Sequence, residues 1–193
     1  MKKLFLLIAA SFMVAATVNA QTTAASLRRE IKLDKKDGKK MEKKEERKAL
    51  RKLEGSEVSY QSKQAFEGDF NHITPISSKR LDNFDEFTFT NKKGITKSAY
   101  YDGDSKLVGT VEDKTFADLP VKGREYISKH FSDYTPGDVI FYDDNEFNET
   151  DMIIYGLQFA DQDSYFVELK KPGEKIVLQI LKDGDVIFFT QLT

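Results

Sequence analysis

Apolar and polar positions alternate in short runs over most of the chain beyond residue 60, and two segments carry apolar residues four positions apart. Phe66 and Phe70 have this spacing, and so do Ile127 and Phe131. Positions i and i+4 share one side of a helix, whereas the alternating run FTFT at 87–90 has the period of a strand. The pattern therefore predicts two helices, each followed by strands.

The region repeats one order of elements: helix, strand, Lys-Lys turn, strand, Asp-Gly turn, strand. The turns are NKKG and YDGD in the first half, and KKPG and KDGD in the second. The second half also contains 138–163, with strand-like runs around an acidic loop. Pro120 is the expected boundary between the two halves, because proline restricts the residue before it and favours the first position of a helix. We expect an α+β fold of two tandem units, 59–118 and 119–193, each with a helical segment packed on an antiparallel sheet.

Turn chemistry gives an expected register for the last three strands. A two-residue type I′ loop at Asp183-Gly184 places Gln179 opposite Phe188. A four-residue loop at 170–173 places Phe166 opposite Val177, and Glu168 opposite Lys175 as an ion pair. One face should then pack on the second helix; it comprises Tyr165, Val167, Leu169, Ile176, Leu178, Ile180, Ile187 and Phe189.

The opposite face is mixed, and its aromatic residues are the candidate contacts. It carries Phe166, Gln179 and Phe188. Another part of the chain could cover these rings, or they could anchor a partner, because aromatic residues on a rigid sheet dominate interface energetics. Tyr100 and Tyr101 are adjacent, so one should enter the core while the other lines the outer surface.

The N-terminus has the pattern of a cleavable export signal. Residues 1–20 begin with two lysines, continue with an apolar run and end in Val-Asn-Ala. The apolar run is at the short end of the length needed to span a bilayer, and with no cysteine there is no lipid-anchor site. We expect a periplasmic or secreted protein without a membrane span.

A charged arm follows at 21–58. We expect 21–38 to be flexible and 39–54 to form a solvated helix that ends at Gly55. From Arg28 to Glu54 the chain carries 13 Lys or Arg and 7 Asp or Glu, whereas residues 55–193 carry 15 and 25. The arm is either a charged tether or a cationic segment that binds anionic surface material. Without interleaved aromatic residues, nucleic acid is not an expected partner.

Composition and motifs argue against catalysis and against a metal or cofactor. The chain has no Cys and two His, His72 and His130, which removes thiolate chemistry and leaves little for an imidazole site. The acidic run 143–151 fails the calcium-loop spacing, because Phe147 and Asn148 stand where a ligand and Gly belong. No catalytic or dinucleotide-binding motif is present. Asn148-Glu149-Thr150 is a weak glycosylation sequon.

The region from about residue 60 onward resembles the PepSY-like family of exported bacterial proteins, which is related in fold to the β-lactamase inhibitor protein. The similarity is carried by Phe66-x-x-x-Phe70, FTFT, Ala99-Tyr100-Tyr101-Asp102, Leu107-Val108-Gly109 and Asp118-Leu119-Pro120 before the second helix. The resemblance implies tandem α+β units that act by binding rather than by catalysis. The second half has no counterpart of Tyr-Tyr-Asp, and no inhibitory residue can be carried over.

Two functions follow as hypotheses. The first is a non-enzymatic exported protein that binds a protein or peptide through the outer sheet face, in an inhibitor-like or modulatory role, with Tyr100 or Tyr101, Phe166, Gln179 and Phe188 as contacts. The second is an envelope-associated structural or tethering protein whose basic arm does the binding.

Overall fold

The computed structural model describes residues 55, 57–160 and 162–192. The predicted export signal at 1–20 and helix at 39–54 lie outside these residues. Val58–Thr193 forms one compact unit, and the account below concerns that unit.

Both predicted helices are present. Helix α3 spans Tyr60–Asp69, and the side chain of Ser59 caps it by accepting a hydrogen bond from the Ser62 N–H. Helix α4 spans Val121–His130 and begins directly after Pro120. Among the described residues, no helix has the length and apolar character needed to cross a membrane.

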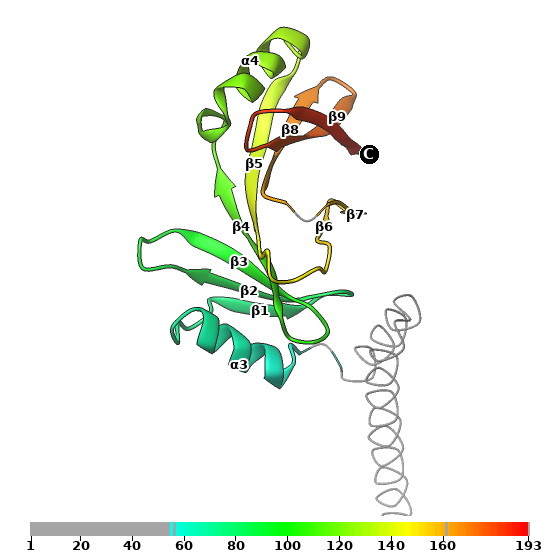
Figure 1. Cartoon of the computed structure of the whole chain (residues 1–193). Coiled ribbons are helices and arrows are strands. Elements are labelled where there is room, and N and C mark those ends of the chain that lie inside the picture. Colours follow the sequence, from blue (N-terminus) through cyan, green and yellow to red (C-terminus); the bar gives the residue numbers. More distant parts are fainter. Residues whose placement is uncertain (1–54, 56, 161, 193) are drawn as a thin grey trace, which may run out of the picture. The chain divides into compact units, whose positions relative to one another are not determined.

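Eight strands form one antiparallel sheet in the order β1-β2-β3-β4-β5-β8-β9-β10 (Figure 1). The strands of both predicted units therefore share a single sheet. A separate two-stranded hairpin, β6-β7, lies within the predicted insertion. The bounds are β1 Ser77–Arg80, β2 Asp85–Thr90, β3 Thr96–Tyr101, β4 Leu107–Lys114, β5 Thr135–Asp144, β6 Ile153–Ile154, β7 Leu157–Gln158, β8 Ser164–Lys171, β9 Glu174–Leu181 and β10 Val186–Leu192.

Both helices pack on the same face of this sheet, here called the helix face. Ala99, which packs with α3, lies opposite Thr110, and Thr110 lies opposite Asp143. Directly opposed residues share a face, as do residues two apart along a strand. Val139, four positions before Asp143, therefore points to the same side, where it joins the core around α4.

The helix face carries two apolar cores. Under α3, the rings of Phe66 and Phe87 stack with centroids 4.8 Å apart. Under α4, Ile127 packs on strand residues that the sequence pattern assigned to this face: Val167, Leu169, Ile176, Leu178 and Ile180. Those assignments are confirmed.

The opposite face, here called the loop face, is covered by the segment 145–163. Met152, Ile154 and Phe159 from this segment pack on Phe166 and on Val177 of the sheet. The β6-β7 hairpin turns through Tyr155 and Gly156, which both have positive φ, as a type I′ turn requires. The strand-like runs predicted within 138–163 are thus present, and the insertion serves as the lid of this face.

The predicted register of β10 is wrong by one residue. Val186 pairs with Ile180, and Phe188 pairs with Leu178. Gly184 has positive φ but Asp183 does not, so the loop is not type I′; it has three residues with Gly in the left-handed region. A one-residue shift exchanges the faces of a strand, and Phe188 accordingly lies on the helix face.

The β8-β9 register is also shifted, by two residues, with no exchange of faces. Lys171 pairs with Glu174 around a two-residue Pro172-Gly173 loop. Glu168 is opposite Val177 rather than Lys175. The predicted ion pair still forms diagonally, with the Lys175 ammonium 2.7 Å from the carboxylate.

Gly109 provides a test of the junction between β4 and β5. A Cβ at Gly109 would lie 2.5 Å from the Tyr142 ring and 2.7 Å from the Asp143 carbonyl oxygen. We expect Gly109→Ala to lower the free energy of unfolding by about 1 to 3 kcal/mol through overpacking. Gly68→Ala in α3, where nothing lies within 4 Å, is the control and should be neutral or stabilising. Equal urea midpoints for the two variants would contradict this packing.

Candidate functional site

Phe166 and Gln179 do not lie on an exposed surface. Phe166 has 0% of its surface exposed, and Gln179 is also buried, with its side-chain amide donating to the Ser164 hydroxyl at 2.9 Å. The exposed position predicted for both is wrong, because 145–163 folds over the loop face. Of the two alternatives weighed from the sequence, a cover supplied by the same chain is the one observed.

Tyr100 and Tyr101 point to opposite faces, as expected. Tyr101 is buried under α3 and donates its hydroxyl to Asp69 at 2.8 Å. Tyr100 is half-buried on the loop face beside Phe84, and donates to Glu86 at 3.0 Å. Burial, together with the neighbouring carboxylate, raises the pKa of both phenols far above the usual range. Both rings serve packing.

Phe188 remains exposed, with 60% of its surface accessible. Because it pairs with Leu178 of the helix face, its side chain is on the same side of the sheet as α4. The start of α4 is tied to the start of β10: Lys122 forms an ion pair with Asp185, and a Cβ at Gly184 would meet Lys122. The side of α4 that carries Lys122 therefore faces β10.

The other end of α4 sets its direction. Phe131, which caps α4, packs against Tyr134, and the Lys171 ammonium lies 4.2 Å from the Tyr134 ring centre. Lys171 belongs to the β8-β9 turn, and this is the end of the sheet where β10 finishes, since Leu192 pairs with Lys175. Helix α4 and strand β10 therefore run in the same direction.

Aromatic residues consequently lie along both sides of this boundary. Tyr126 and His130 follow Lys122 at intervals of four, and their rings are in contact, with centroids 4.4 Å apart and planes tilted by 33°. From the Lys122–Asp185 pair, Tyr126 lies about one helical turn (about 5.4 Å) along α4 and His130 about two, whereas Phe188 lies three strand residues (about 10 Å) along β10. Phe188 is therefore between the levels of Tyr126 and His130. We call Tyr126, His130 and Phe188 the α4-β10 surface.

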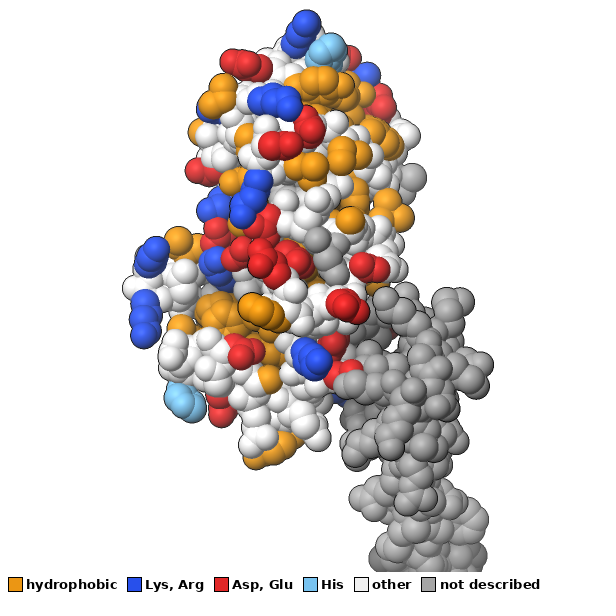
Figure 2. All heavy atoms as spheres, viewed as in Figure 1, with side chains coloured by type: hydrophobic (Ala, Val, Ile, Leu, Met, Phe, Trp, Pro, Cys, Tyr) orange, Lys and Arg blue, Asp and Glu red, His pale blue; other side chains and the backbone are white. Residues whose placement is uncertain are grey.

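Apolar side chains gather at this end of the unit. Figure 2 shows them over the part formed by α4 and β8-β10. Exposed large hydrophobic residues from these two outer elements are Val121, Tyr126, Ile187 and Phe188. Ile187 pairs with Gln179 and lies on the loop face, so only the other three are on the α4 side of the sheet. An exposed apolar patch of this kind marks an interaction surface more often than a solvated one.

Tyr126 was not predicted as a site residue. The spacing of Ile127 and Phe131 correctly indicated the buried side of α4, but the adjacent series Lys122, Tyr126 and His130 led to no prediction. That series of residues four apart was visible in the sequence. What it faces was not, because the direction of α4 along β10 is set by contacts between distant segments.

Phe147 is an exposed aromatic residue outside the α4-β10 surface, with 94% of its surface accessible. Neighbouring side chains hold its loop: the amide groups of Asn145 and Asn148 donate to the Leu107 carbonyl oxygen at 2.7 and 3.0 Å. The sequon asparagine, Asn148, is thus buried and hydrogen-bonded, so its amide is not accessible to a glycosylating enzyme in the folded protein.

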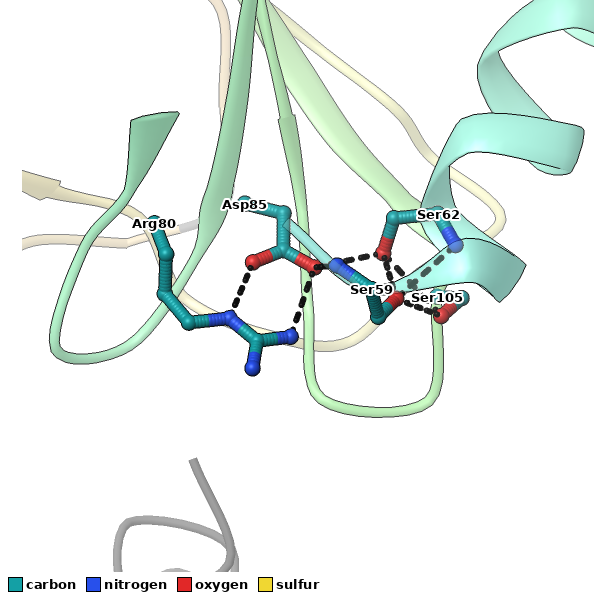
Figure 3. Close-up of polar contacts among 5 residues, drawn as sticks. All are labelled: Ser59, Ser62, Arg80, Asp85 and Ser105. Atoms are coloured by element: carbon teal, nitrogen blue, oxygen red, sulfur yellow. Dashed lines mark hydrogen bonds and ion pairs between the residues drawn. The ribbon is translucent and has the colours of Figure 1, made fainter. Parts of the chain in front are cut away.

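A buried serine cluster joins α3 to β2 (Figure 3). The Asp85 carboxylate accepts hydrogen bonds from the Ser59 N–H at 3.0 Å and the Ser62 hydroxyl at 2.8 Å, and pairs with Arg80 at 3.0 Å. The Ser62 hydroxyl also lies within hydrogen-bond distance, 3.0 Å, of the Ser105 hydroxyl. A nucleophile needs access and a general base, whereas Ser62 is fully buried and lies next to a carboxylate already paired with Arg80. The cluster is structural.

The metal-binding and histidine-dependent sites considered from the sequence concern two histidines and the acidic side chains. Over the described residues, no group of three or more His, Asp or Glu side chains is arranged to hold a metal ion. His72 and His130 are both exposed, and the His130 ring packs against the Tyr126 ring.

No protein-family model matches the chain, and no curated protein matches it. Solved structures do match. A BLIP-like protein from Bacteroides fragilis has 14% identity and a TM-score of 0.53, with 70% of this chain and 86% of that chain covered. A protein assigned to the periplasm of Bacteroides eggerthii has 15% identity and a TM-score of 0.56, with 70% and 90% covered.

A DUF2874 family protein from Bacteroides uniformis is also similar, with 12% identity, a TM-score of 0.56, and 69% of this chain and 89% of that chain covered. The fold is BLIP-like. This confirms the fold-level part of the resemblance noted in the sequence, whereas the PepSY assignment stays a prediction. At these identities the likeness establishes the fold alone.

Replacing Phe166 and Phe188 by alanine, one at a time, tests where the structure places these two predicted contact residues. Phe166→Ala should lower the free energy of unfolding by about 3 to 5 kcal/mol, because it empties a buried site. Phe188→Ala should change it by no more than about 0.5 kcal/mol, because the ring is exposed. Urea unfolding of both variants measures the difference, and comparable losses would show that Phe188 belongs to the core.

Two buried carboxylates predict the response to acid. Burial raises the pKa of Glu112, but the adjacent Lys114 and Lys97 outweigh it and hold that pKa below its usual value of 4.5. Lys175 and Lys170 do the same for Glu168 on the other face. A carboxyl pKa lowered by folding contributes stability above its unfolded value, which is lost as the pH falls through the folded value.

The free energy of unfolding should therefore fall between pH values of about 5 and 2. The Glu112→Gln, Glu168→Gln double variant should be less stable at neutral pH and should lose less on acidification. Urea midpoints across this range measure both effects. An unchanged pH dependence in the double variant would remove these carboxylates as its source.

Proposed function

We propose that this protein is an exported, non-enzymatic binding protein that contacts a protein or peptide partner through the α4-β10 surface. The carrying observation is the exposure of Tyr126 and Phe188 on either side of one boundary. Aromatic anchors held by rigid elements supply most of the binding energy in protein interfaces. Of the contacts expected from the sequence, Phe188 is retained; Phe166, Gln179 and Tyr101 are buried, and Tyr100 is half-buried.

The fold supports binding as the mode of action. The similar solved structures include a BLIP-like protein and a protein assigned to the periplasm, which agrees with an exported binding role. Each helix of the described unit is followed by four strands of the sheet, which supports the tandem organisation 59–118 and 119–193. The polar clusters described above are committed to the fold rather than to catalysis.

The scaffold around this surface is held at both ends of α4. At its start, Lys122 pairs with Asp185, and Gly123 lies so close to Ile180 that a Cβ would be 2.8 Å from its side chain. At its end, Phe131 packs against Tyr134, whose ring lies under the Lys171 ammonium. Helix and strand can therefore present their aromatic residues without a large rearrangement, which limits the entropy lost on binding.

The charge contrast along the chain favours a second candidate. Residues 28–54 carry an excess of six positive charges, and residues 55–193 carry an excess of ten negative charges. A basic arm of this kind could tether the protein to anionic envelope material. Such binding would weaken with salt, because exposed charges are screened over about 8 Å at physiological ionic strength.

Affinity capture from the native cell envelope separates the two. Phe188→Glu should abolish capture of the partner, because a charge replaces an apolar anchor, while the cooperative melt stays intact. Phe147→Glu is the matched control, since it changes an exposed phenylalanine away from the α4-β10 surface. The partner should be identified by mass spectrometry and its binding to each variant measured with purified components.

Other outcomes of the capture experiment would assign binding to a different part of the chain. Loss of capture with Phe147→Glu and not with Phe188→Glu would place the binding surface on the β5-β6 loop. Loss only when 28–54 is deleted, together with sensitivity to salt, would support the tether.

A further inference from the structure

The two outer strands of the sheet differ in chemistry. Strand β1 at one edge has four residues, Ser77–Arg80, two of which are Lys79 and Arg80. Strand β10 at the other edge has seven residues, Val186–Leu192, with no charged side chain and the sequence VIFFTQL. Short length and positive charge are the usual means by which an edge strand avoids pairing with another chain. Only β1 has them.

The outer side of β10 is open among the described residues. It pairs with β9 on one side and with no described strand on the other. An edge strand presents unpaired N–H and C=O groups, which another extended strand can satisfy. A bulge between Phe188 and Thr190 is its one protective feature, and it leaves the segments 186–188 and 190–192 on either side.

The charges that flank β10 are already paired within the chain. Asp185 pairs with Lys122, and Lys175, opposite Leu192, pairs with Glu168. Lys182, in the turn before β10, pairs with Asp163. Asp183, in the same turn, accepts a hydrogen bond from the Asp185 N–H. The edge strand itself carries no charged side chain, so the strand that complements it best is also uncharged. Residues 186–192 of a second copy meet that requirement.

We propose that the protein forms a homodimer in which the β10 strands of two copies pair antiparallel about a two-fold axis. Such an interface is self-complementary, since each copy offers the same edge to the other. Exposed apolar side chains on both faces of β10, Ile187 with 44% and Phe188 with 60% of its surface accessible, each gain a neighbour from the second strand. This assembly does not depend on the proposed function.

Cross-linking tests the geometry directly, because the chain has no cysteine. Each of residues 186–192 is replaced in turn by Cys in the chain from Gln21 onward, and the disulfide dimer is measured after mild oxidation. A disulfide needs Cα atoms about 4.4 to 6.8 Å apart, so cross-linking should peak at the position nearest the two-fold axis and fall off on both sides. Ser78→Cys on β1 is the control.

Light scattering supplies the second measurement. The unmodified protein should show twice the monomer mass as concentration rises, and Ile187→Lys should halve that mass by placing like charges at the interface. Ile95→Lys, which changes a similarly exposed residue in the β2-β3 turn, should leave the dimer intact. Envelope capture by Ile187→Lys should persist, which separates loss of the dimer from loss of the partner surface.

The proposal is overturned by a monomer at every concentration, with no β10 position cross-linking above the Ser78→Cys control. It is equally overturned by a dimer that cross-links through β1, or by cross-linking that is uniform along β10. Pairing of β10 with a strand of another protein while this chain alone stays monomeric would also replace it.

Discussion

The pairing of β4 with β5 is the constraint on which the rest of this structure depends. It joins the strands that follow α3 to those that follow α4 and so makes one eight-stranded sheet. Gly109 permits the approach, because its missing side chain leaves room for the Tyr142 ring. The Tyr142 hydroxyl of β5 donates to Asp144 at 2.8 Å and lies 3.2 Å from the Val108 carbonyl oxygen of β4, a second link between the two strands.

A continuous sheet needs a cover on each face, and the two covers differ. Both helices lie on one face, while 145–163 closes the other over Phe166. Buried polar side chains are then used to hold these covers in place: Asp85 at the start of α3, and Asn148 in the loop that leads into the lid. Buried polar groups must be satisfied, and in this protein that requirement absorbs most of the residues that could otherwise carry chemistry. The boundary of α4 with β10 keeps its aromatic residues exposed.

Much of the fold was predictable from local pattern. Spacing placed both helices, alternation placed the strands, and the β8 and β9 residues that pack on α4 were assigned to the correct face. Ile187 and Phe189 of β10 were assigned to that face and lie on the other. The Glu168–Lys175 pair formed although its loop was predicted two residues too long, because a shift by two leaves the faces of a strand unchanged. A similar argument identified Tyr100 and Tyr101 as residues of opposite faces without stating which would be buried.

The sequence by itself determined which residues share a face within each strand, because side chains alternate with a period set by the backbone alone. Tertiary structure decided what each face meets. Phe166 lies under a lid whose closure depends on contacts between distant segments, and Phe188 changes sides because the Asp183-Gly184 turn closes with three residues rather than two. Both loops satisfy the same local turn chemistry, so only packing of β10 along α4 and β9 could select between them.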